Sequence, residues 1–430
     1  MKVYLDTIGC RLNQAEIESY ARQFHAAGHD LVAHPQEADL AVINTCTVTS
    51  EAASDSRQKV RQLSRAGVGE IVVTGCWATL SPQEAAALPG VRQIVPNAIK
   101  DRLVPDLLHQ PLATFELQPV ERQLIPGARL RTRAFIKVQD GCDNHCTFCV
   151  TTLARGAGLS RSIGEVMADI HAACKATRDH GSAKEIVLTG VHLGSWGQDF
   201  SPRLHLRHLV QAIIDESDVP RIRLSSLEPW DLDVEFFTLW ENPRLSRQLH
   251  LPLQSGCAAT LRRMARKTTP QAYADLVTSA RKSIPGVAIT TDVMAGFPGE
   301  TEAEFEESLA FLRTMSFAAG HAFTYSARPG TAAAHMPDQV AHEIRKERNA
   351  RIRAVFAESS LAYQQDFLGQ VLPVLWENAF SFEPSGWQVS GLTDNYLRVK
   401  AVAPRHLWNE ITQVRLAGAT EDGMIGEIVS

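Results

Sequence analysis

The sequence predicts an α/β protein in three parts: an N-terminal parallel α/β domain, a central partial barrel of six βα units, and a small all-β barrel at the C-terminus. The first two parts are predicted because short β-rich runs alternate with helical patterns in two successive segments. The last part is predicted because five short strand patterns follow with no helical pattern of comparable length. A chain of 430 residues has room for two or three such domains.

The first segment, up to about residue 110, contains three strand patterns, each followed by a helical pattern. The strand patterns cover residues 3–8, 40–44 and 70–74, and the helical patterns cover 13–27, 50–65 and 82–88. Such alternation is typical of a parallel sheet covered by helices. An aperiodic, Pro-bearing stretch over residues 111–126 predicts a linker to the next segment.

The second segment repeats the alternation six times, which suits an open or partial barrel. Its strand patterns cover residues 134–139, 185–191, 221–227, 250–254, 287–295 and 320–326. Helical patterns between them include residues 163–178, 204–216, 271–282 and 301–315. In folds of this kind the ligands bind at the carboxyl ends of the strands.

The last segment follows a basic, helix-like stretch that contains Arg345, Lys346, Arg348, Arg351 and Arg353. Its five strand patterns cover residues 371–377, 387–391, 396–402, 411–416 and 424–429. Five short strands without a long helix predict a small closed barrel.

Composition excludes several classes of protein. Hydrophobic residues make up 44% of the chain and charged residues 21%, which excludes a disordered or collagen-like protein. The apolar runs are far shorter than the roughly 18 residues that a membrane span needs. The formal net charge of −5 argues against a globally basic nucleic-acid binder, but not against local basic patches. The N-terminus has no signal-peptide pattern, so we expect a cytoplasmic protein with reduced cysteines.

Three of the eight cysteines form the strongest motif in the sequence. Cys142, Cys146 and Cys149 have the spacing C-x3-C-x2-C directly after the first strand of the six-unit segment. Three thiolates in one loop can hold a cubane iron–sulfur cluster and leave its fourth iron open to a substrate's amino and carboxylate groups. A structural zinc site with His145 as the fourth ligand is the alternative.

Cys10, Cys46 and Cys76 are far apart in the sequence but occupy the same position relative to predicted strands. Each follows the carboxyl end of a strand, so the three thiols are expected to meet at one edge of the parallel sheet. A second set of three cluster ligands is one interpretation, and small buried side chains at strand ends are the other. Cys174 and Cys257 are interpreted as packing residues, with a site role left open for Cys257.

These cysteines and their surroundings resemble the radical S-adenosylmethionine methylthiotransferase family. The C-x3-C-x2-C loop, with Phe148 before its last cysteine, resembles the superfamily motif, and the β-rich tail resembles the RNA-binding TRAM domain. The resemblance divides the chain into a methylthiotransferase N-terminal domain at 1–112, a radical SAM core at 128–358 and a TRAM domain at 361–430. Several further motifs resemble the branch that acts on threonylcarbamoyladenosine in tRNA: Thr7-Ile-Gly-Cys-Arg-Leu-Asn-Gln14, Asn44-Thr-Cys-Thr-Val-Thr49, His250-Leu-Pro-Leu-Gln-Ser-Gly256 and Gly296-Phe-Pro-Gly-Glu-Thr301.

The resemblance implies a tRNA methylthiotransferase with two 4Fe–4S clusters and S-adenosylmethionine as cofactors. Cys142, Cys146 and Cys149 would hold the cluster that binds S-adenosylmethionine, and Cys10, Cys46 and Cys76 an auxiliary cluster that carries the sulfur. Gly190 would leave room for the methionyl group, and Phe148 would lie near the adenine, with ordinary packing as the alternative. The resemblance assigns no catalytic residue. It implies tRNA, a flavodoxin- or ferredoxin-like electron donor and a sulfur source as partners, and no membrane.

Three other functions remain open from the sequence. They are an isopentenyladenosine tRNA methylthiotransferase, a ribosomal-protein aspartate methylthiotransferase, and a non-catalytic iron–sulfur protein that binds RNA.

RNA attraction is expected from the central segment rather than from the tail. Between residues 121 and 161, seven basic residues face three acidic ones, and a second basic group follows at Arg262, Arg263, Arg266 and Lys267. Within these groups, Arg155 and Arg161 are candidates to pair with a carboxylate or with RNA phosphate, or to be solvated. From residue 368 onward, four basic residues stand against seven acidic ones.

Overall fold

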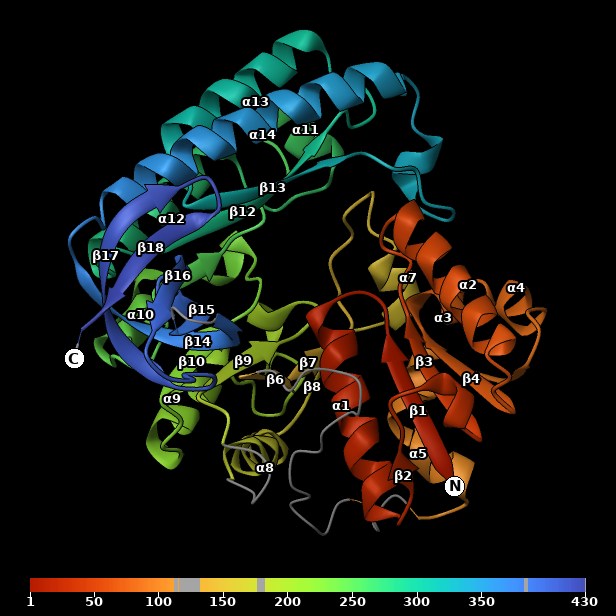
Figure 1. Ribbon diagram of the computed structural model, residues 1–430. Helices are drawn as coiled ribbons and strands as arrows, with labels where there is room; N and C mark the ends of the chain where they lie inside the picture. Colours follow the sequence, from red (N-terminus) through yellow and green to blue (C-terminus); the bar gives the residue numbers. More distant parts are fainter. Residues whose placement is uncertain (112–114, 116–131, 176–181, 383–385, 430) are drawn as a thin grey trace.

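The computed structural model describes residues 1–111, 115, 132–175, 182–382 and 386–429 (Figure 1). Its first domain is a five-stranded sheet in the order β2-β1-β3-β4-β5, and all neighbouring strands are parallel. The strands are β1 (Lys2–Thr7), β2 (Asp30–Leu31), β3 (Leu40–Thr45), β4 (Glu70–Gly75) and β5 (Val91–Val95). All six residues of β3 are buried, as expected for a central parallel strand covered on both faces.

Helices cover this sheet, and one of them, α2, begins at a side-chain cap. They are α1 (Arg11–Ala26), α2 (Ser50–Arg65), α3 (Cys76–Leu80), α4 (Pro82–Ala86) and α5 (Leu103–Leu108). The Thr49 hydroxyl accepts a hydrogen bond from the Ala52 N–H and so caps α2.

The central domain contains six parallel strands arranged as a partial barrel. They are β6 (Arg133–Lys137), β9 (Glu185–Thr189), β10 (Arg221–Leu224), β11 (Gln248–His250), β12 (Ala288–Ala295) and β13 (Ala319–Thr324). The sheets β10-β9-β6 and β11-β12-β13 are joined by the bridges Ile222–Leu245 and Ser226–His250. A short antiparallel pair, β7 (Gln139–Asp140) and β8 (Leu159–Ser160), brackets the cysteine loop.

Helices surround the outer face of the six strands (Figure 1). The short helix α7 (Thr151–Arg155) lies instead against α3 of the first domain. The outer helices are α8 (Ile163–Cys174), α9 (Leu206–Glu216), α10 (Val234–Phe237), α11 (Ala258–Arg263), α12 (Pro270–Ser283), α13 (Glu302–Met315) and α14 (His342–Gln365). One large hydrophobic core packs these helices against alternate strand residues, among them Ile186, Ile222 and Ile289.

The C-terminal domain is a closed barrel of five strands in the order β14-β15-β16-β18-β17. The strands are β14 (Val371–Phe382), β15 (Gly386–Thr393), β16 (Arg398–Ala403), β17 (Ile411–Thr420) and β18 (Gly423–Ile428). This architecture is TRAM-like, and its core includes Trp376, Val399 and Val414.

Buried arginines attach the C-terminal barrel to β10. Arg223 donates to the backbone oxygens of Thr393 and Asp394, each at 3.1 Å, and Arg221 donates to Leu392 O at 2.9 Å. Arg223 also pairs with Glu185 at 2.7 Å, so its charge is compensated inside the interface. The small barrel is therefore held in one position on the central domain.

The predicted α/β, partial-barrel and all-β organisation is confirmed, and each predicted strand corresponds to a strand of the structure. Three strands, β2, β5 and β8, were not predicted, because β2 and β8 have only two residues each and β5 is largely exposed. Most of the expected linker, and the end of the helix expected over 163–178, lie outside the described residues. The domain boundaries taken from the resemblance stay predictions. No helix among the residues that the structure describes is long and apolar enough to cross a membrane.

Candidate metal centres

The strand register brings Cys10, Cys46 and Cys76 to the carboxyl edge of the first sheet. Cys46 follows β3 directly and Cys76 follows β4, in a register that pairs Thr45 with Gly75. Gly9 (φ 118°) lies against Cys46, where a Cβ atom would be 2.6 Å from the Cys46 Cβ. The charges of Cys10 and Cys76 both act on Cys46, whose pKa is raised to about 11, mainly by burial. The expected convergence of the three positions is therefore present.

Two asparagines that the sequence analysis did not single out contact these thiols. Asn13, in the first turn of α1, places its Oδ1 3.6 Å from Cys10 Sγ and donates from Nδ2 to Thr45 O at 3.1 Å. Asn97 places its Nδ2 3.7 Å from Cys76 Sγ. Cys46 and Cys76 are buried whereas Cys10 is exposed, so the group opens to its surroundings on the Cys10 side.

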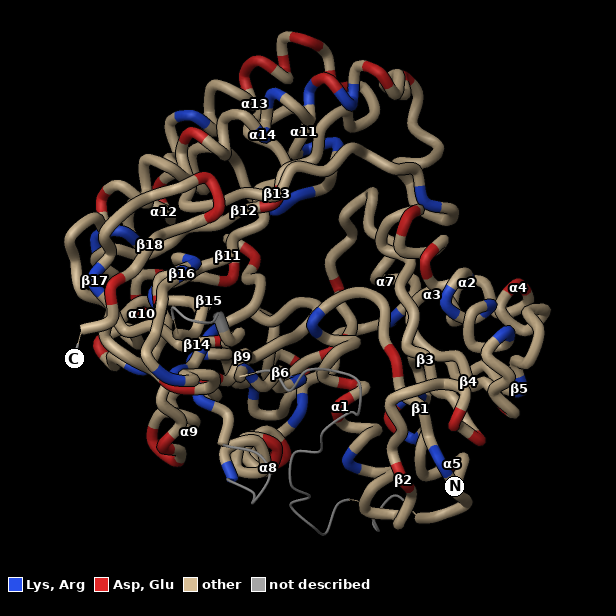
Figure 2. Tube along the Cα trace, in the orientation of Figure 1, with Lys and Arg blue, Asp and Glu red and all other residues tan. Residues whose placement is uncertain are grey.

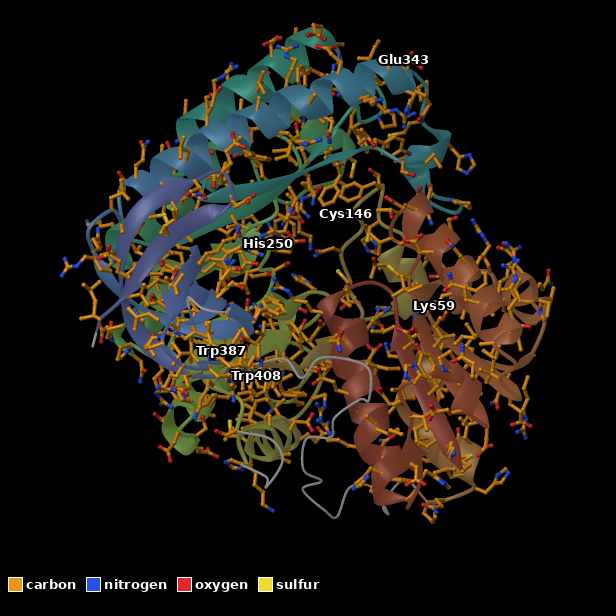
Figure 3. All side chains as sticks on the ribbon, in the orientation of Figure 1. Lys59, Cys146, His250, Glu343, Trp387 and Trp408 are labelled. Carbon is orange, nitrogen blue, oxygen red and sulfur yellow. The ribbon has the colours of Figure 1, made fainter. Side chains whose placement is uncertain are left out.

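Cys142, Cys146 and Cys149 lie in the loop between β7 and α7, and all three are half-buried. The Asn144 N–H donates to Cys142 Sγ at 3.4 Å, and the Cys149 N–H donates to Cys146 O at 3.0 Å, so the loop folds around its own thiols. Figure 3 shows Cys146 on the side of the barrel that faces the N-terminal domain.

Two cationic side chains contact this loop. Arg266 places its Nη1 3.7 Å from Cys146 Sγ and also pairs with Glu228 and covers the ring of Trp230 at 4.6 Å. His192 pairs with Asp231 at 2.6 Å, and hydrogen bonds to Asp231 and to the Cys142 thiol outweigh burial and raise the His192 pKa to about 10. Positive charge beside thiolates stabilises them and tunes a bound metal centre.

Gly190 and Phe148 both lie next to the cysteine loop. A Cβ atom on Gly190 would be 2.9 Å from Gln139 Oε1, so glycine permits the close approach of this buried glutamine at the carboxyl end of β9. Phe148 packs edge-to-face on Phe297 at 6.4 Å and contacts the small core formed by Met264, Phe297 and Tyr325. The packing expected of Phe148 is thus present, and the cofactor roles of both residues stay predictions.

The two cysteine groups are connected through the short helix α7. It begins two residues after Cys149, and its last residue, Arg155, donates to Asn13 Oδ1 at 2.7 Å and to Glu16 Oε1 at 3.0 Å. The Ala154 carbonyl of the same helix accepts from Asn97 Nδ2 at 2.8 Å. Five helical residues span only about 8 Å, so one short helix and the side chains of Arg155 and Asn97 connect the two groups of thiols.

A second arginine joins the central domain to the N-terminal domain, beside the sheet edge that carries Cys10, Cys46 and Cys76. Arg328, which follows β13, donates to Thr47 Oγ1 at 2.6 Å and to Ser50 Oγ at 3.0 Å. The carboxyl edge of the first sheet is therefore fixed between segments that follow the first and last barrel strands.

The donor sets fit cubane clusters better than single ions. Within the described ranges, no group of three or more His, Cys, Asp or Glu side chains is arranged to hold one metal ion, so the zinc alternative with His145 has no preformed site there. Each cysteine of a cubane cluster binds a different iron atom, so three separated thiolates suffice. Cys174 packs on the main core, and the buried Cys257 donates to Glu307 at 3.2 Å, which agrees with their interpretation as packing residues.

The expected basic patches prove to be largely compensated. Arg155 and Arg161 pair with carboxylates, so solvation is the wrong interpretation for Arg155, whose side chain is 1% exposed. Lys137 lies among Glu16, Asp101 and Asp140. In the second group, Arg263 pairs with Glu304 and Arg266 with Glu228. Three other arginines of the first group, Arg122, Arg129 and Arg131, lie outside the described residues. Figure 2 shows acidic and basic positions interspersed over α13 and α14.

Comparisons with known proteins agree with this architecture. Residues 2–96 match the uncharacterized protein family UPF0004, and residues 136–312 match the radical SAM superfamily. Among solved structures, the radical S-adenosylmethionine methyltransferase TsrM from Kitasatospora setae is similar at a TM-score of 0.55, with 14% identity over 77% of this chain and 75% of that one. The cobalamin-dependent radical enzyme OxsB is similar at 0.51, with 11% identity over 83% of this chain and 56% of that one. At such identity these two show the fold alone.

Curated relatives match over almost the whole chain. The threonylcarbamoyladenosine tRNA methylthiotransferase of Bacillus subtilis is 35% identical over 97% of this chain and 94% of its own, and that of Thermotoga maritima is 33% identical over 98% and 96%. The tRNA-2-methylthio-N(6)-dimethylallyladenosine synthase of Anoxybacillus flavithermus is 30% identical over 100% and 83%. The two cysteine groups, the radical SAM match and these full-length relatives together show that the chain belongs to the tRNA methylthiotransferase family of radical S-adenosylmethionine enzymes.

Proposed function

We propose that the chain methylthiolates carbon-2 of threonylcarbamoyladenosine beside the anticodon of tRNA, with one 4Fe–4S cluster on each group of three cysteines. The observation that carries the proposal is the connection between the two groups. Arg155 and Ala154 of α7 contact Asn13 and Asn97, which in turn contact Cys10 and Cys76. A substrate held between the groups would be within reach of both.

The protein side chains provide the charge and the shape that such chemistry needs. When bound, the clusters and S-adenosylmethionine would supply one-electron cleavage of the sulfonium and a sulfur atom for insertion. Arg266 and His192 place positive charge beside Cys146 and Cys142 and would stabilise their thiolates. Gly190 and Phe148 are the proposed neighbours of S-adenosylmethionine, because Gly190 lies at the carboxyl end of β9 and Phe148 belongs to the cysteine loop itself.

The choice of threonylcarbamoyladenosine is supported by the relatives. Four that carry this name are 32–35% identical to the chain, whereas three named for dimethylallyladenosine, the isopentenyl modification, are 28–30% identical. The proposed reaction also requires an electron donor, which we expect to be flavodoxin- or ferredoxin-like, and a source of sulfur.

Mass spectrometry of tRNA nucleosides from a deletion strain tests the substrate. Loss of the methylthio group from threonylcarbamoyladenosine alone, with restoration by the plasmid-borne gene, is the expected result. Loss from isopentenyladenosine would overturn the proposal in favour of that substrate. Mass spectrometry of ribosomal proteins from the same strain covers the third candidate, and loss of a methylthio group from an aspartate there would overturn the proposal as well. A reconstituted, dithionite-reduced sample that releases no 5′-deoxyadenosine from S-adenosylmethionine would indicate a non-catalytic protein instead.

A further inference from the structure

The inner face of the partial barrel is covered by other domains only over its first strands. On β6 and β9, Phe135 and Val187 pack against Ala15 of α1. On β10, Arg221 and Arg223 are buried under the C-terminal barrel. The inner face of β13, at the other end of the barrel, stays exposed, and 45% of the Phe323 surface is accessible.

Strand alternation identifies the side chains on this exposed inner face. On β11 and β12, Leu249, Ile289 and Val293 enter the hydrophobic core under the outer helices, so their alternates, His250 and Asp292, point inward. On β13, Gly320 lies against the Phe356 ring of α14, so His321 and Phe323 point inward. We call His250, Asp292, His321 and Phe323 the inner row. Figure 3 shows His250 on the barrel side that faces the N-terminal domain.

Hydrogen bonds within the inner row leave polar groups available. Thr290 Oγ1 accepts a hydrogen bond from Gln248 Nε2 at 3.2 Å and lies 2.9 Å from His250 Nδ1. The Thr290 hydroxyl can therefore donate its proton to His250 Nδ1. His250 Nε2 lies 3.3 Å from Asp292 Oδ2, as a charge contact without a hydrogen bond. Among the described residues no group donates a hydrogen bond to the Asp292 carboxylate, so its oxygens can accept from a ligand.

His321 and Phe323 extend this polar pair toward the edge of the barrel. The register pairs Asp292 with His321 on the next strand, so the two side chains are neighbours on one face. The His321 ring lies 6.3 Å from the Phe323 ring at a tilt of 37°, and both side chains are exposed. Met294, beside Phe323 in the register, packs on the small core that also holds Phe148, so the inner row runs toward the cysteine loop.

We propose that the inner row is the pocket for the threonylcarbamoyl group of the substrate base and selects it over an isopentenyl group. This inference rests on the proposed function, which it deepens. A urea N–H or the threonyl hydroxyl would donate to Asp292, the threonyl carboxylate would accept from His321, and Phe323 would contact the base. An isopentenyl group offers no polar partner, so Asp292 and His321 would gain no hydrogen bond when bound tRNA covers the inner row. A site built to hydrogen-bond its substrate discriminates strongly against an analogue that lacks the polar groups.

The test compares the reconstituted holoenzyme and its variants on one tRNA in three forms: with threonylcarbamoyladenosine, with unmodified adenosine and with isopentenyladenosine. Dissociation constants and kcat/KM for methylthio formation are measured for each form. We expect His321→Ala and Asp292→Asn to reduce the ratio of kcat/KM for the threonylcarbamoyl form to that for unmodified adenosine by about tenfold or more. His342→Ala is the matched control, because His342 is an exposed histidine at the start of α14.

The outcomes separate the inference from the function on which it rests. If the wild-type enzyme prefers the threonylcarbamoyl form and both variants retain that preference, the inner row is not the pocket. If the wild-type enzyme acts only on the isopentenyl form, the proposed function itself fails. Should His321→Ala not yield folded protein with cluster absorbance, Asp292→Asn alone carries the same comparison, with loss of preference expected and retention contradicting the pocket.

Discussion

The guanidinium of Arg155 donates to Asn13 Oδ1 at 2.7 Å, although the two residues belong to different domains. Asn13 Oδ1 also lies 3.6 Å from Cys10 Sγ, whereas Arg155 follows Cys149 by one short helix. The same guanidinium pairs with Glu16 at 3.0 Å and with Asp140 at 2.9 Å. One buried cation therefore sets the position of the first cysteine group relative to the second.

Arg155→Met is expected to destabilise the junction between the two domains. It leaves a buried carboxylate short of a partner, and removing one member of a buried ion pair costs about 3–5 kcal/mol. The melting temperature should therefore fall. In a background where Cys142, Cys146 and Cys149 are replaced by alanine, only the cluster on the first cysteine group remains. Its reduction potential should be lower in the Arg155→Met variant, because a nearby positive charge is gone. Both are measured on purified protein, by calorimetry and by redox titration with electron paramagnetic resonance.

Arg57→Met is the matched control for this substitution. Arg57 pairs with Glu84 on the surface, where both side chains are partly exposed, so a change below about 1 kcal/mol is expected. Equal effects of the two substitutions would contradict a special role of Arg155.

The positions of the six cysteines were predictable because strand ends and loop spacing are local properties of a sequence. Cys46 and Cys76 follow predicted strands, and parallel pairing then brings them to one edge without knowledge of any other contact. The second cysteine group could be predicted from the C-x3-C-x2-C spacing alone.

The groups that surround the cysteines could not be predicted in the same way. Asn97 and Arg155 act through contacts across 57 and more residues, and Asn97 follows β5, a strand whose exposed residues give no hydrophobic pattern. The inner row became visible only when the strand register paired His250 with Thr290 and Asp292 with His321. Partner choice among charged residues depends on tertiary structure, so Lys137, Arg155 and Arg266 looked free in the sequence but pair with carboxylates in the fold.

Replacing Cys10, Cys46 and Cys76 together by alanine should separate the two proposed clusters. Iron content should fall to about half, because three thiolates hold one cubane. Release of 5′-deoxyadenosine should persist, but methylthio product should disappear. The Cys174→Ala, Cys257→Ala double variant is the control, since these cysteines pack in the fold, and its iron content should match the wild type. Unchanged iron in the triple variant would exclude an auxiliary cluster at this edge.

Acid should weaken the junction around Glu16. Burial alone would raise the pKa of the Glu16 carboxyl, but Arg155, Lys100 and Lys137 outweigh it and lower the pKa to about 2. An unfolded glutamate titrates at about 4.3, so this stabilisation is complete above that pH and is lost as the pH falls toward 2, on the order of 3 kcal/mol in all. Melting temperatures between pH 7 and pH 3 should fall more steeply for the wild type than for Glu16→Gln. Parallel curves for the two proteins would show that Glu16 does not titrate in this way.

Arg223→Gln should loosen the C-terminal barrel from the central domain without unfolding either. Arg223 is fully buried and donates to Glu185 and to the Thr393 and Asp394 carbonyls, so a shorter neutral side chain leaves Glu185 short of a partner and two carbonyls unpaired. Each lost buried partner costs about 1–3 kcal/mol, enough to raise the open population severalfold or more. Hydrogen exchange over residues 386–403 should accelerate, whereas β1 and β3 should be unaffected. Arg405→Gln, which breaks an exposed pair with Glu410, is the control, and equal exchange in the two variants would show that the arginine contacts do not hold the barrel in place.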